Sequence, residues 1–579
     1  MKLRHALIFA LAVTACTSRP KDGVYTFQVL TTNDTHGTWF DSTYTGGGIK
    51  KSLYGIMAKV DSVRQAVGKE NVILVDAGDC LQGDNAVYYY DYVDTVSPHL
   101  YPRLAEYMGY EAVAVGNHDI EAGHHVYDRV AKQLEAKGIP FMAANAVRTD
   151  NGKPYFTPYK IIKRNGLKIA ILGYTNANMK EWLSEDIWSG MDFKNLIPQV
   201  QEDVDRITAK EKPQMVIVLV HSGTGKGDGS ILESQGLDLY ESLHGVDFLV
   251  CSHDHSARIV EGDEICLIDS GSHSRNVGHG EITITIKDGK VVDKKLRAEL
   301  IPVVASQVDT AMRNYFRKDF ETVKAFSTRE IGELQVDLVS KDSYKGMCDY
   351  VNLIHAVCLG CSPAEISFAA PLSYNKTIKA GTLVYNDLIN IYPYENLLYI
   401  VKMTGEEVKN FLEYSYDGWI EQNDLKGNGH VLRIQKKNDL RNSQDGWSFV
   451  KRSYNFDSAG GLVYTVDVTK PKGERVNIIS MADGSAFDMA KEYNVAMTSY
   501  RANGGGSTLP EGAGIKNVNE RIVKRYPEIR NIIYDYIKEK GTLDPAVFSD
   551  PALIGHWSFI PSPQAQNAIE ADWKLLFGK

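Results

Sequence analysis

Residues 111–119 read Glu-Ala-Val-Ala-Val-Gly-Asn-His-Asp, and this stretch indicates both a fold class and the position of a site. Its short apolar run is rich in valine, which is typical of a buried strand. The run stops at Gly116, and Asn117, His118 and Asp119 follow at once. Because ligands of open α/β sheets bind at the carboxyl ends of strands, these polar side chains are candidates for chemistry.

Apolar runs of the same kind recur between residues 24 and 300. The further runs that we expect to form strands are Tyr25–Thr31, Asn71–Asp76, Lys168–Gly173, Gln214–Val220, Val246–Cys251 and Glu264–Ile268. Stretches with helical spacing lie between them, such as Tyr54–Val67 and His124–Ala136. The alternation predicts a layered α/β domain over residues 24–300, in which β-sheets are flanked by helices.

Seven side chains that follow five of these runs have the chemistry of metal ligands. They are Asp34, His36, Asp79, Asn117, His221, His253 and His255. Each one alone would more often be a turn residue, a helix cap or a satisfied core histidine. Together they are too many for one ion and predict two divalent metal ions. Their mixture of carboxylate, imidazole and amide suits Zn²⁺, Mn²⁺, Fe or Co²⁺, and two such ions can stabilise a displacement at phosphorus.

The motifs Asp34-x-His36, Gly78-Asp79, Gly116-Asn117-His118-Asp119, His221 and His253-x-His255 resemble the pattern of the calcineurin-like metallophosphoesterases. More narrowly, the chain resembles the bacterial 5′-nucleotidase family, which includes the 2′,3′-cyclic-nucleotide 2′-phosphodiesterase/3′-nucleotidases. The resemblance implies that one ion is held by Asp34, His36, Asp79 and His255. It implies that the other is held by Asp79, Asn117, His221 and His253, with Asp79 bridging. It further implies that a metal-held hydroxide attacks the phosphorus while His118 faces the phosphate.

Two positions depart from the family pattern. Ser252 stands where the family often has glycine, before the paired histidines. Glu121 stands three positions after His118, where 5′-nucleotidases commonly have aspartate. The residue that orients His118 therefore stays open between Asp119 and Glu121, since Glu121 could instead be an acidic residue that a helix dipole favours.

After the first domain, residues 305–326 predict a linker helix with Met312, Tyr315, Phe316, Phe320 and Val323 on one face. Residues 328–545 predict a second domain of α+β character, which the resemblance identifies as the substrate-binding nucleotidase domain. Residues 546–579 contain Pro and Trp with little periodicity, and we expect them to form a tail packed on the surface.

The family binds its nucleoside between two aromatic rings of this second domain. Tyr500, which precedes a glycine-rich run, resembles the residue that carries one ring. Phe456 is the favoured candidate for the other ring, with Tyr454 close behind, and Asn117 is counted with the substrate contacts as well as with the metal ligands. Stacking on a base tolerates base identity.

The resemblance predicts a metal-dependent phosphohydrolase that releases nucleoside and phosphate from nucleotides. The motif Tyr392-Pro393-Tyr394-Glu395-Asn396 looks closer to the cyclic-phosphodiesterase branch, and Arg329 is the only arginine between the linker helix and Arg433. Both observations slightly favour 2′,3′-cyclic or 3′-nucleotides over 5′-nucleotides. Two alternatives remain: a hydrolase of nucleotide-sugars or other phosphoesters, and a binding lipoprotein that has kept the fold without the chemistry.

The N-terminus and the composition bear on location and partners. A basic start, an apolar run of ten residues and Val13-Thr14-Ala15-Cys16 resemble a bacterial lipoprotein signal, with Cys16 lipidated and residues 1–16 as the signal segment. We therefore expect export and anchoring at the cell envelope through lipid alone. The 579 residues predict at least two domains, and a net charge of −9 without a basic block gives no support for a nucleic-acid polymer as partner. The oligomeric state stays open.

Overall fold

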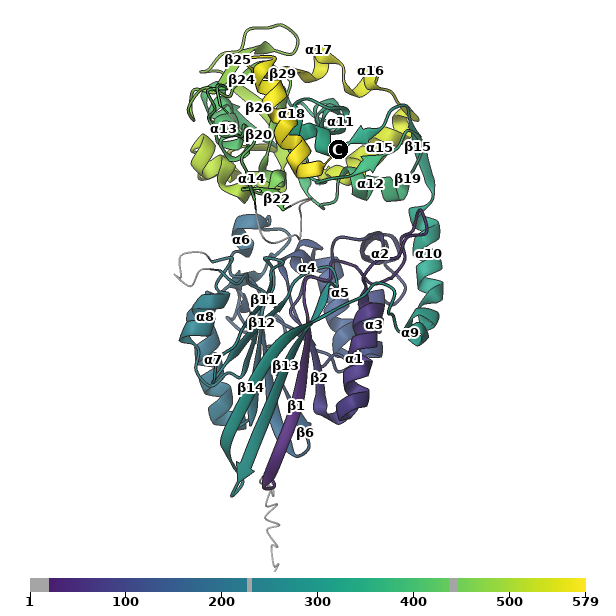
Figure 1. Cartoon of the computed structure of the whole chain (residues 1–579), viewed down its shortest axis with the longest axis vertical. Coiled ribbons are helices and arrows are strands. Elements are labelled where there is room, and N and C mark those ends of the chain that lie inside the picture. Colours follow the sequence, from purple (N-terminus) through teal and green to yellow (C-terminus); the bar gives the residue numbers. More distant parts are fainter. Residues whose placement is uncertain (1–19, 226–231, 428, 437–445, 579) are drawn as a thin grey trace, which may run out of the picture.

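The computed structural model describes residues 20–225, 232–427, 429–436 and 446–578, so Cys16 lies outside the described residues. The chain forms two domains stacked along the long axis of the molecule (Figure 1). We call the elements from β1 to β14 the first domain and those from β15 to α18 the second domain. Among the described residues, no helix combines the length and the apolar character that a membrane crossing requires.

The first domain contains two six-stranded sheets. One has the order β14-β13-β1-β2-β3-β4, and the other has the order β11-β12-β10-β9-β7-β6. The strands of the first sheet are β1 (Gly23–Thr32), β2 (Val72–Asp76), β3 (Ala112–Ala114), β4 (Phe141–Met142), β13 (Asn276–Lys287) and β14 (Lys290–Pro302). The strands of the second are β6 (Tyr159–Arg164), β7 (Leu167–Tyr174), β9 (Met215–Val220), β10 (Phe248–Val250), β11 (Ala257–Val260) and β12 (Cys266–Ser270).

The two sheets pack face to face, and helices cover their outer faces. Buried side chains of both sheets, such as Val29 and Ile217, share one apolar cluster between them. The covering helices are α1 (Leu53–Val67), α3 (Leu100–Met108) and α5 (His124–Glu135) on one side, and α7 (Leu196–Glu211) and α8 (Gly236–Ser242) on the other. This arrangement confirms the predicted layered α/β domain.

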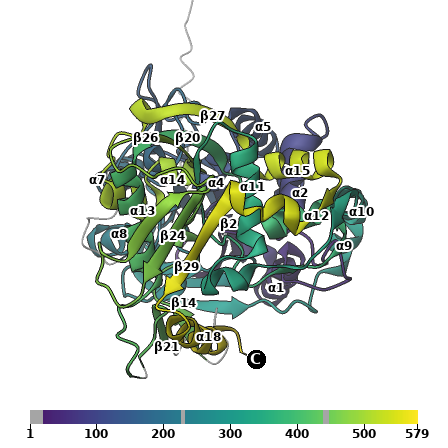
Figure 2. The ribbon, with the colours of Figure 1, turned by 90° about the horizontal axis from the view of Figure 1, so that it is seen from above.

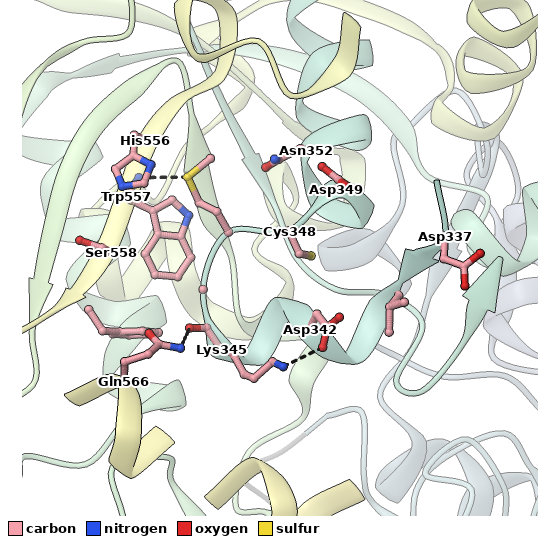
Figure 3. Close-up of a pocket in the computed structure, with 14 residues that line it drawn as sticks. Asp337, Asp342, Lys345, Cys348, Asp349, Asn352, His556, Trp557, Ser558 and Gln566 are labelled. Carbon is pink, nitrogen blue, oxygen red and sulfur yellow. Dashed lines mark hydrogen bonds and ion pairs between the residues drawn. The ribbon is translucent and has the colours of Figure 1, made fainter. Parts of the chain in front are cut away.

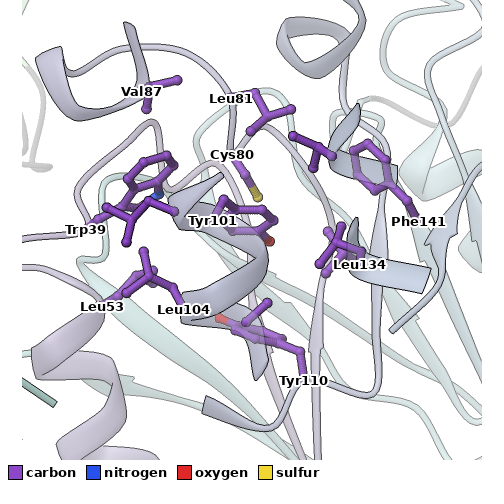
Figure 4. Packing of buried hydrophobic residues seen from close by; sticks show 14 of the residues in the cluster. Trp39, Leu53, Cys80, Leu81, Val87, Tyr101, Leu104, Tyr110, Leu134 and Phe141 are labelled. Carbon is purple, nitrogen blue, oxygen red and sulfur yellow. The ribbon is translucent and has the colours of Figure 1, made fainter. Parts of the chain in front are cut away.

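The helices also fix the loops at the carboxyl ends of the strands. Figure 4 shows Cys80 and Leu81, which follow β2, packed among Tyr101 and Leu104 of α3 and Leu134 of α5. These side chains are fully or almost fully buried. The loop that begins the site is therefore part of the apolar core rather than a free surface segment.

Residues 305–326 do not form one helix. Two helices, α9 (Thr310–Tyr315) and α10 (Arg317–Ser327), meet at Phe316, whose φ of −95° and ψ of 13° interrupt the helix. Phe316 is fully buried, and the Arg103 guanidinium lies 5.5 Å from the centre of its ring. Tyr315 is 66% exposed, whereas Met312 and Val323 are fully buried, so the face expected to be common to these residues does not include Tyr315.

The second domain is built on a sheet of order β23-β17-β26-β20-β27. Figure 2 shows β26, β20 and β27 of this sheet from above. Its strands are β17 (Ile366–Ala369), β20 (Leu397–Thr404), β23 (Ser458–Gly460), β26 (Glu492–Thr498) and β27 (Ile522–Glu528). Alternate residues of β20 face opposite sides: Leu398 and Ile400 pack with α11 (Asp349–Gly360) and α15 (Ile529–Lys540), whereas Tyr399 and Val401 pack with α13 (Gly405–Trp419). The predicted α+β character is confirmed.

The last residues are not a surface tail. Strand β29 (Gly555–Ile560) pairs in parallel with β24 (Leu462–Asp467), and α18 (Gln564–Phe577) follows it. Trp557 and Phe559 of β29 and Phe577 of α18 are buried in the main apolar cluster of the domain. The expectation for residues 546–579 is therefore wrong, because two alternate buried aromatic residues already mark a strand with one buried face.

Candidate metal centre

The seven predicted ligand residues lie together at the end of the first domain that faces the second domain. The sheet of β1, β2 and β3 supplies four of them, in the loops after these strands: Asp34, His36, Asp79 and Asn117. The other sheet supplies three, after β9 and β10: His221, His253 and His255. Parallel neighbouring strands bring the loops to one edge of each sheet, and the packing of the sheets brings the two edges together.

The first group of side chains is Asp34, His36 and His255. The Nε2 atoms of the two histidines lie 2.9 Å apart, and Asp34 Oδ1 lies 3.7 Å from Nε2 of His255 and 4.0 Å from Nε2 of His36. All three offer a ligand atom within 4.8 Å of one another. Asn33 Nδ2 donates a hydrogen bond of 2.7 Å to Asp34 Oδ2, which fixes the carboxylate.

The second group is Asp79, His221 and His253, with the Asn117 amide between them. Asp79 Oδ2 lies 3.2 Å from His221 Nε2. Asn117 Oδ1 lies 3.0 Å from His221 Nε2 and 2.9 Å from His253 Nδ1. Ala77 O lies 2.8 Å from His221 Nδ1 and Ser252 Oγ lies 3.0 Å from it, so this nitrogen is engaged and Nε2 is directed into the group.

The chemistry of the donors fits two cations. Burial lowers the pKa of His253 and of His255 to about 3 and that of His36 well below its ordinary value, so these imidazoles are neutral and have a lone pair for a metal. Burial, with the charge of Asp79 adding to it, raises the pKa of Asp34 to about 8. A buried carboxylate of this kind is stabilised by a cation next to it.

Backbone strain is concentrated at the same residues. Five of the seven hold φ angles between 45° and 77°, in the left-handed region that residues other than glycine seldom adopt: Asp34, His36, Asp79, His253 and His255. Such conformations cost free energy and persist where the surrounding structure enforces them. The loops are therefore shaped to direct these side chains inward.

His118 stands beside the metal-ligand groups without joining either. Its Nδ1 lies 2.5 Å from Glu121 Oε2, and its backbone N–H donates to Asp79 Oδ1 at 2.9 Å. Burial works against protonation of His118, but the charges of Asp79 and Glu121 outweigh it and raise its pKa to about 10. Of the two candidates for orienting this ring, Glu121 is the one that contacts it.

Asp119 has a different place. Its carboxylate is fully buried and accepts backbone N–H groups of Asp79, Cys80, Leu81 and Gly116 at 2.7–3.0 Å. It joins the loop after β2 to the loop after β3 and does not contact the His118 ring. Of the two candidates for orienting His118, Asp119 is therefore the one that serves the backbone of these loops.

Two further aromatic side chains at the centre had no part in the sequence-based predictions. The His273 ring lies 5.2 Å from the His36 ring and 5.8 Å from the His255 ring. It follows β12, so the rule of polar residues after a strand would have found it. Trp182 of α6 (Met179–Trp182) stacks on His253 with 5.0 Å between ring centres, and no motif indicates it.

The predicted aromatic residues of the second domain separate into two environments. Phe456 is fully buried, stacks on Trp419 at 5.5 Å and contacts Phe449 at 5.0 Å, so it has no face left for a base, which corrects the preference for this ring. Tyr454 and Tyr500 are half-buried instead. Tyr394 lies next to Tyr454, with ring centres 6.4 Å apart.

These tyrosines face the first domain. Burial raises the pKa of Tyr500 to about 12, and the charges of Tyr454 and of Glu233, which lies beyond β9 in the first domain, add to the rise. Asn503, three residues after Tyr500, donates a hydrogen bond of 2.8 Å to Trp182 O. Because Trp182 stacks on His253, Trp182 connects the Tyr500 segment with the metal-ligand groups.

A hollow of about 570 Å³ lies in the second domain, beside the start of α11 and β29 (Figure 3). Its carboxylates already have partners. Asp337 pairs with Lys379, Asp342 pairs with Lys345, and Asp349 accepts a hydrogen bond from Ser549. The hollow has none of the predicted site residues.

The chain matches the family model of the calcineurin-like phosphoesterases over residues 27–257 and that of the 5′-nucleotidase C-terminal domain over residues 330–510. It is 25% identical to the trifunctional nucleotide phosphoesterase protein YfkN of Bacillus subtilis, over 92% of this chain and 39% of that protein, so it spans well under half of that relative's length. It is 23% identical to the 2′,3′-cyclic-nucleotide 2′-phosphodiesterase/3′-nucleotidase of Haemophilus influenzae, over 92% of this chain and 87% of that protein.

Solved structures share the fold. A Staphylococcus aureus protein described as a 5′-nucleotidase superposes with a TM-score of 0.74 at 18% identity, covering 92% of this chain and 99% of that chain. The 5′-nucleotidase precursor of Thermus thermophilus gives 0.59 at 20% identity, covering 93% and 100%. The chain therefore contains a calcineurin-like phosphoesterase domain followed by a 5′-nucleotidase C-terminal domain.

Proposed function

We propose that this protein hydrolyses nucleotides with two divalent metal ions, in the space between its two domains. The observation that carries the proposal is the pair of ligand groups next to the His118–Glu121 contact and opposite the half-buried tyrosines. The names of the relatives, which are nucleotide phosphoesterases and nucleotidases, support the substrate class. A hydrolase of other phosphoesters is the alternative.

In this proposal Asp34, His36 and His255 would hold one ion, and Asn117, His221 and His253 would hold the other. Asp79 would be a ligand common to both, because its Oδ2 lies next to His221 while its charge also acts on the pKa of His36 and His255. When bound, the ions supply positive charge to the phosphate and lower the pKa of a coordinated water. Nitrogen, carboxylate and amide donors suit Zn²⁺, Mn²⁺, Fe or Co²⁺.

His118 is proposed as the proton donor to the leaving oxygen. Glu121 holds Nδ1, so the proton that can be given to substrate is on Nε2. Glu121 thereby fixes the ring orientation and stabilises its protonated form. A protonated ring also adds positive charge where negative charge develops on the phosphate.

We propose Tyr500 and Tyr454 as the two rings that hold the base, with Tyr394 beside Tyr454. Each ring keeps part of its surface exposed, and the Tyr500 segment contacts Trp182 next to the metal-ligand groups. Stacking of a base on such rings contributes about 1–3 kcal/mol. Asn117 lies at the edge of the same space and would contact the substrate phosphate.

The preference for 2′,3′-cyclic or 3′-nucleotides rests on the motif at residues 392–396 and on the arginines. Arg329 stacks on Phe326 and Tyr385, with its guanidinium carbon 4.3 and 4.4 Å from their ring centres, and so is engaged at the start of the second domain. Arg501 and Arg530 are buried and paired with Asp457 and Glu395. None of these three is free to bind the phosphate of a 5′-nucleotide.

For the location, we propose export and lipid anchoring through Cys16. The support is the sequence alone, a basic start and a short apolar run that ends in Val13-Thr14-Ala15-Cys16. Mass spectrometry of the membrane fraction should find a diacylglyceryl group on Cys16, and Cys16→Ser should release the protein from the membrane. A Cys16→Ser protein that stays bound would contradict the anchor.

The activity is tested by turnover with defined metals. Chain purified without the first sixteen residues, loaded with Mn²⁺ or Zn²⁺, is offered 5′-AMP, 3′-AMP, 2′,3′-cyclic AMP, UDP-glucose and bis(4-nitrophenyl) phosphate. We expect turnover of the nucleotides, fastest with 2′,3′-cyclic AMP or 3′-AMP. Hydrolysis of UDP-glucose or the aryl ester alone would favour the alternative, and no turnover with both ions bound would refute catalysis.

A further inference from the structure

Arg501 joins the two segments that carry the tyrosines of the substrate site. We call residues 453–457 the Tyr454 loop and residues 499–507 the Tyr500 loop. Only 2% of Arg501 is exposed, and its guanidinium donates to atoms of both loops. Nη2 donates to Tyr454 O at 2.6 Å, Nη1 to Asn455 Oδ1 at 2.9 Å and to Gly505 O at 2.7 Å, and Nε to Asp457 Oδ2 at 2.8 Å.

The charge of Arg501 is balanced by one buried carboxylate. Asp457 is almost fully buried and lies at the end of the Tyr454 loop, so the ion pair itself bridges the two loops. A planar guanidinium can engage several acceptors in fixed directions, which the single ammonium of lysine does not do. The relative position of the two loops is therefore set by one side chain.

The glycines of the Tyr500 loop are adapted to this contact. A Cβ atom added at Gly506 would lie 2.5 Å from Arg501 Nη1 and 2.6 Å from Asn455 Oδ1, and Gly506 holds a φ of +71°. A Cβ at Gly505 would lie 2.5 Å from Cε2 and Cζ of the Tyr500 ring. The absence of side chains at these two positions lets the ring and the guanidinium lie against the backbone.

We propose that Arg501 is a positioning residue that sets the separation of Tyr454 and Tyr500, and with it the affinity for the base of a nucleotide. The proposal rests on the proposed function, because it needs the two tyrosines to hold the base. Arg501 itself does not contact substrate, since its donors are occupied by the two loops. Its effect should therefore appear in substrate binding and leave the chemistry at the metal-ligand groups unchanged.

The test compares Arg501→Lys with wild type in the metal-loaded full chain. We expect KM for the preferred nucleotide and Kd for adenosine to rise about tenfold or more, because a base between misplaced rings loses stacking. We expect kcat to change less than about threefold, and hydrolysis of bis(4-nitrophenyl) phosphate, which has no base, to stay within about twofold. Arg521→Lys is the matched control: Arg521 pairs with Glu407 outside both loops, and this change should leave all these values as in wild type.

Gly506→Ala disturbs the same contact from the Tyr500 loop, because its Cβ would press on Arg501 Nη1 and Asn455 Oδ1, and it leaves both Arg501 and Asp457 in the chain. This variant replaces Arg501→Lys if Arg501→Lys does not fold. An unchanged KM and adenosine Kd in the folded variant would overturn the proposal. An equal loss with the base-free ester would also overturn it, because Arg501 would then only support the fold.

Failure of the proposed function would look different. Wild type would then hydrolyse the base-free ester but no nucleotide. If instead Tyr454→Ala and Tyr500→Ala raise KM while Arg501→Lys does not, the nucleotide function stands and the positioning role of Arg501 fails.

Discussion

Asp119 and Glu121 lie on the same helical turn, yet their surroundings give them different tasks. Asp119 receives four backbone N–H groups and is inaccessible, whereas Glu121 meets the ring of His118. A carboxylate that satisfies buried donors acts on stability, and one that holds a catalytic ring acts on rate. Substitution of Asp119 should therefore change mainly stability, and substitution of Glu121 should change mainly the rate of hydrolysis.

We predict that Asp119→Asn lowers the free energy of unfolding by about 1–3 kcal/mol, because an amide NH₂ would face N–H groups that now donate to oxygen. Glu121→Gln should leave stability nearly unchanged and lower kcat by about tenfold or more. Urea unfolding and steady-state kinetics on both variants decide this. The assignment is wrong if the two variants lose stability and rate in the same proportion.

We also predict that His118→Ala lowers kcat by about 10²–10⁴-fold, the usual contribution of an acid–base group, and leaves metal content near that of wild type. Asp79→Asn is the comparison, because loss of the proposed bridging carboxylate should remove both metal and activity. Elemental analysis after gel filtration measures the metal. Metal loss in His118→Ala would place His118 among the ligands instead.

At the scale of elements, the second domain depends on its final helix. Phe577 lies on the last turn of α18, 5% exposed, with its ring parallel to that of Tyr344 at 5.6 Å. Strand β29, which comes before α18 in the chain, is attached to the same domain by pairing with β24. Residues beyond the match to the 5′-nucleotidase C-terminal domain, which ends at residue 510, thus complete the core of the second domain.

We predict that Phe577→Ala destabilises the second domain by about 3–5 kcal/mol, the usual cost of removing a buried aromatic side chain. Lys574→Ala on the exposed side of the same helix should change stability by less than about 0.5 kcal/mol. Calorimetry of the two variants measures the difference. Equal, small effects would mean that α18 is a surface tail after all.

Helix α11 carries a buried histidine that should make stability depend on pH. Burial lowers the pKa of His355, which contacts Ser367 Oγ and Ser458 Oγ, to about 3. Below the unfolded pKa of about 6.5 the unfolded chain binds a proton that the folded chain does not, so stability falls as pH decreases from 6.5 toward 3. The slope is at most about 1.4 kcal/mol per pH unit, and urea unfolding at pH 7 and pH 5 should show a smaller loss for His355→Gln. The same loss in both proteins would contradict this.

At the scale of the whole molecule, hydrogen bonds join the two domains. Asn85 and Tyr88 of the first domain bond to Asn386 and Asn531 of the second, and Asn503 bonds to Trp182. The metal-ligand groups belong to the first domain alone. Metal and nucleoside should therefore stabilise different parts of the molecule.

We predict that removal of metal with a chelator lowers the melting temperature of the first domain and leaves that of the second nearly unchanged. Ligands at 100 times their Kd contribute about 2.7 kcal/mol, a shift of a few degrees for a domain of this size. Differential scanning calorimetry with and without Mn²⁺ separates the two transitions. A shift of the second transition alone would place the metal elsewhere.

The sequence predicts a feature of the fold or of the site when the residues that determine the feature are close together in the chain. Asp34 and His221 each follow an apolar run, so their places at strand ends were predictable. The division of the strands between two sheets was not, because a run such as Met215–Val220 is equally apolar in one sheet or two. Phe456 and Tyr454 lie two positions apart in an irregular segment where no period fixes which one faces the core. The contact of Trp182 with His253 joins residues far apart in sequence, and no local pattern carries that information.

Each proposed ion takes ligands from both sheets, with Asp34 and His36 from one and His255 from the other in the first group. The first ligand group extends over residues 34–255 and the second over residues 79–253, so an emerging chain has no complete group until His253 has been made and the sheets have joined. The protein can therefore bind its metal ions only in the cellular compartment in which it finishes folding. Since affinities of such donors follow a general order and do not select one metal, the ions that the protein carries should record those present in that compartment.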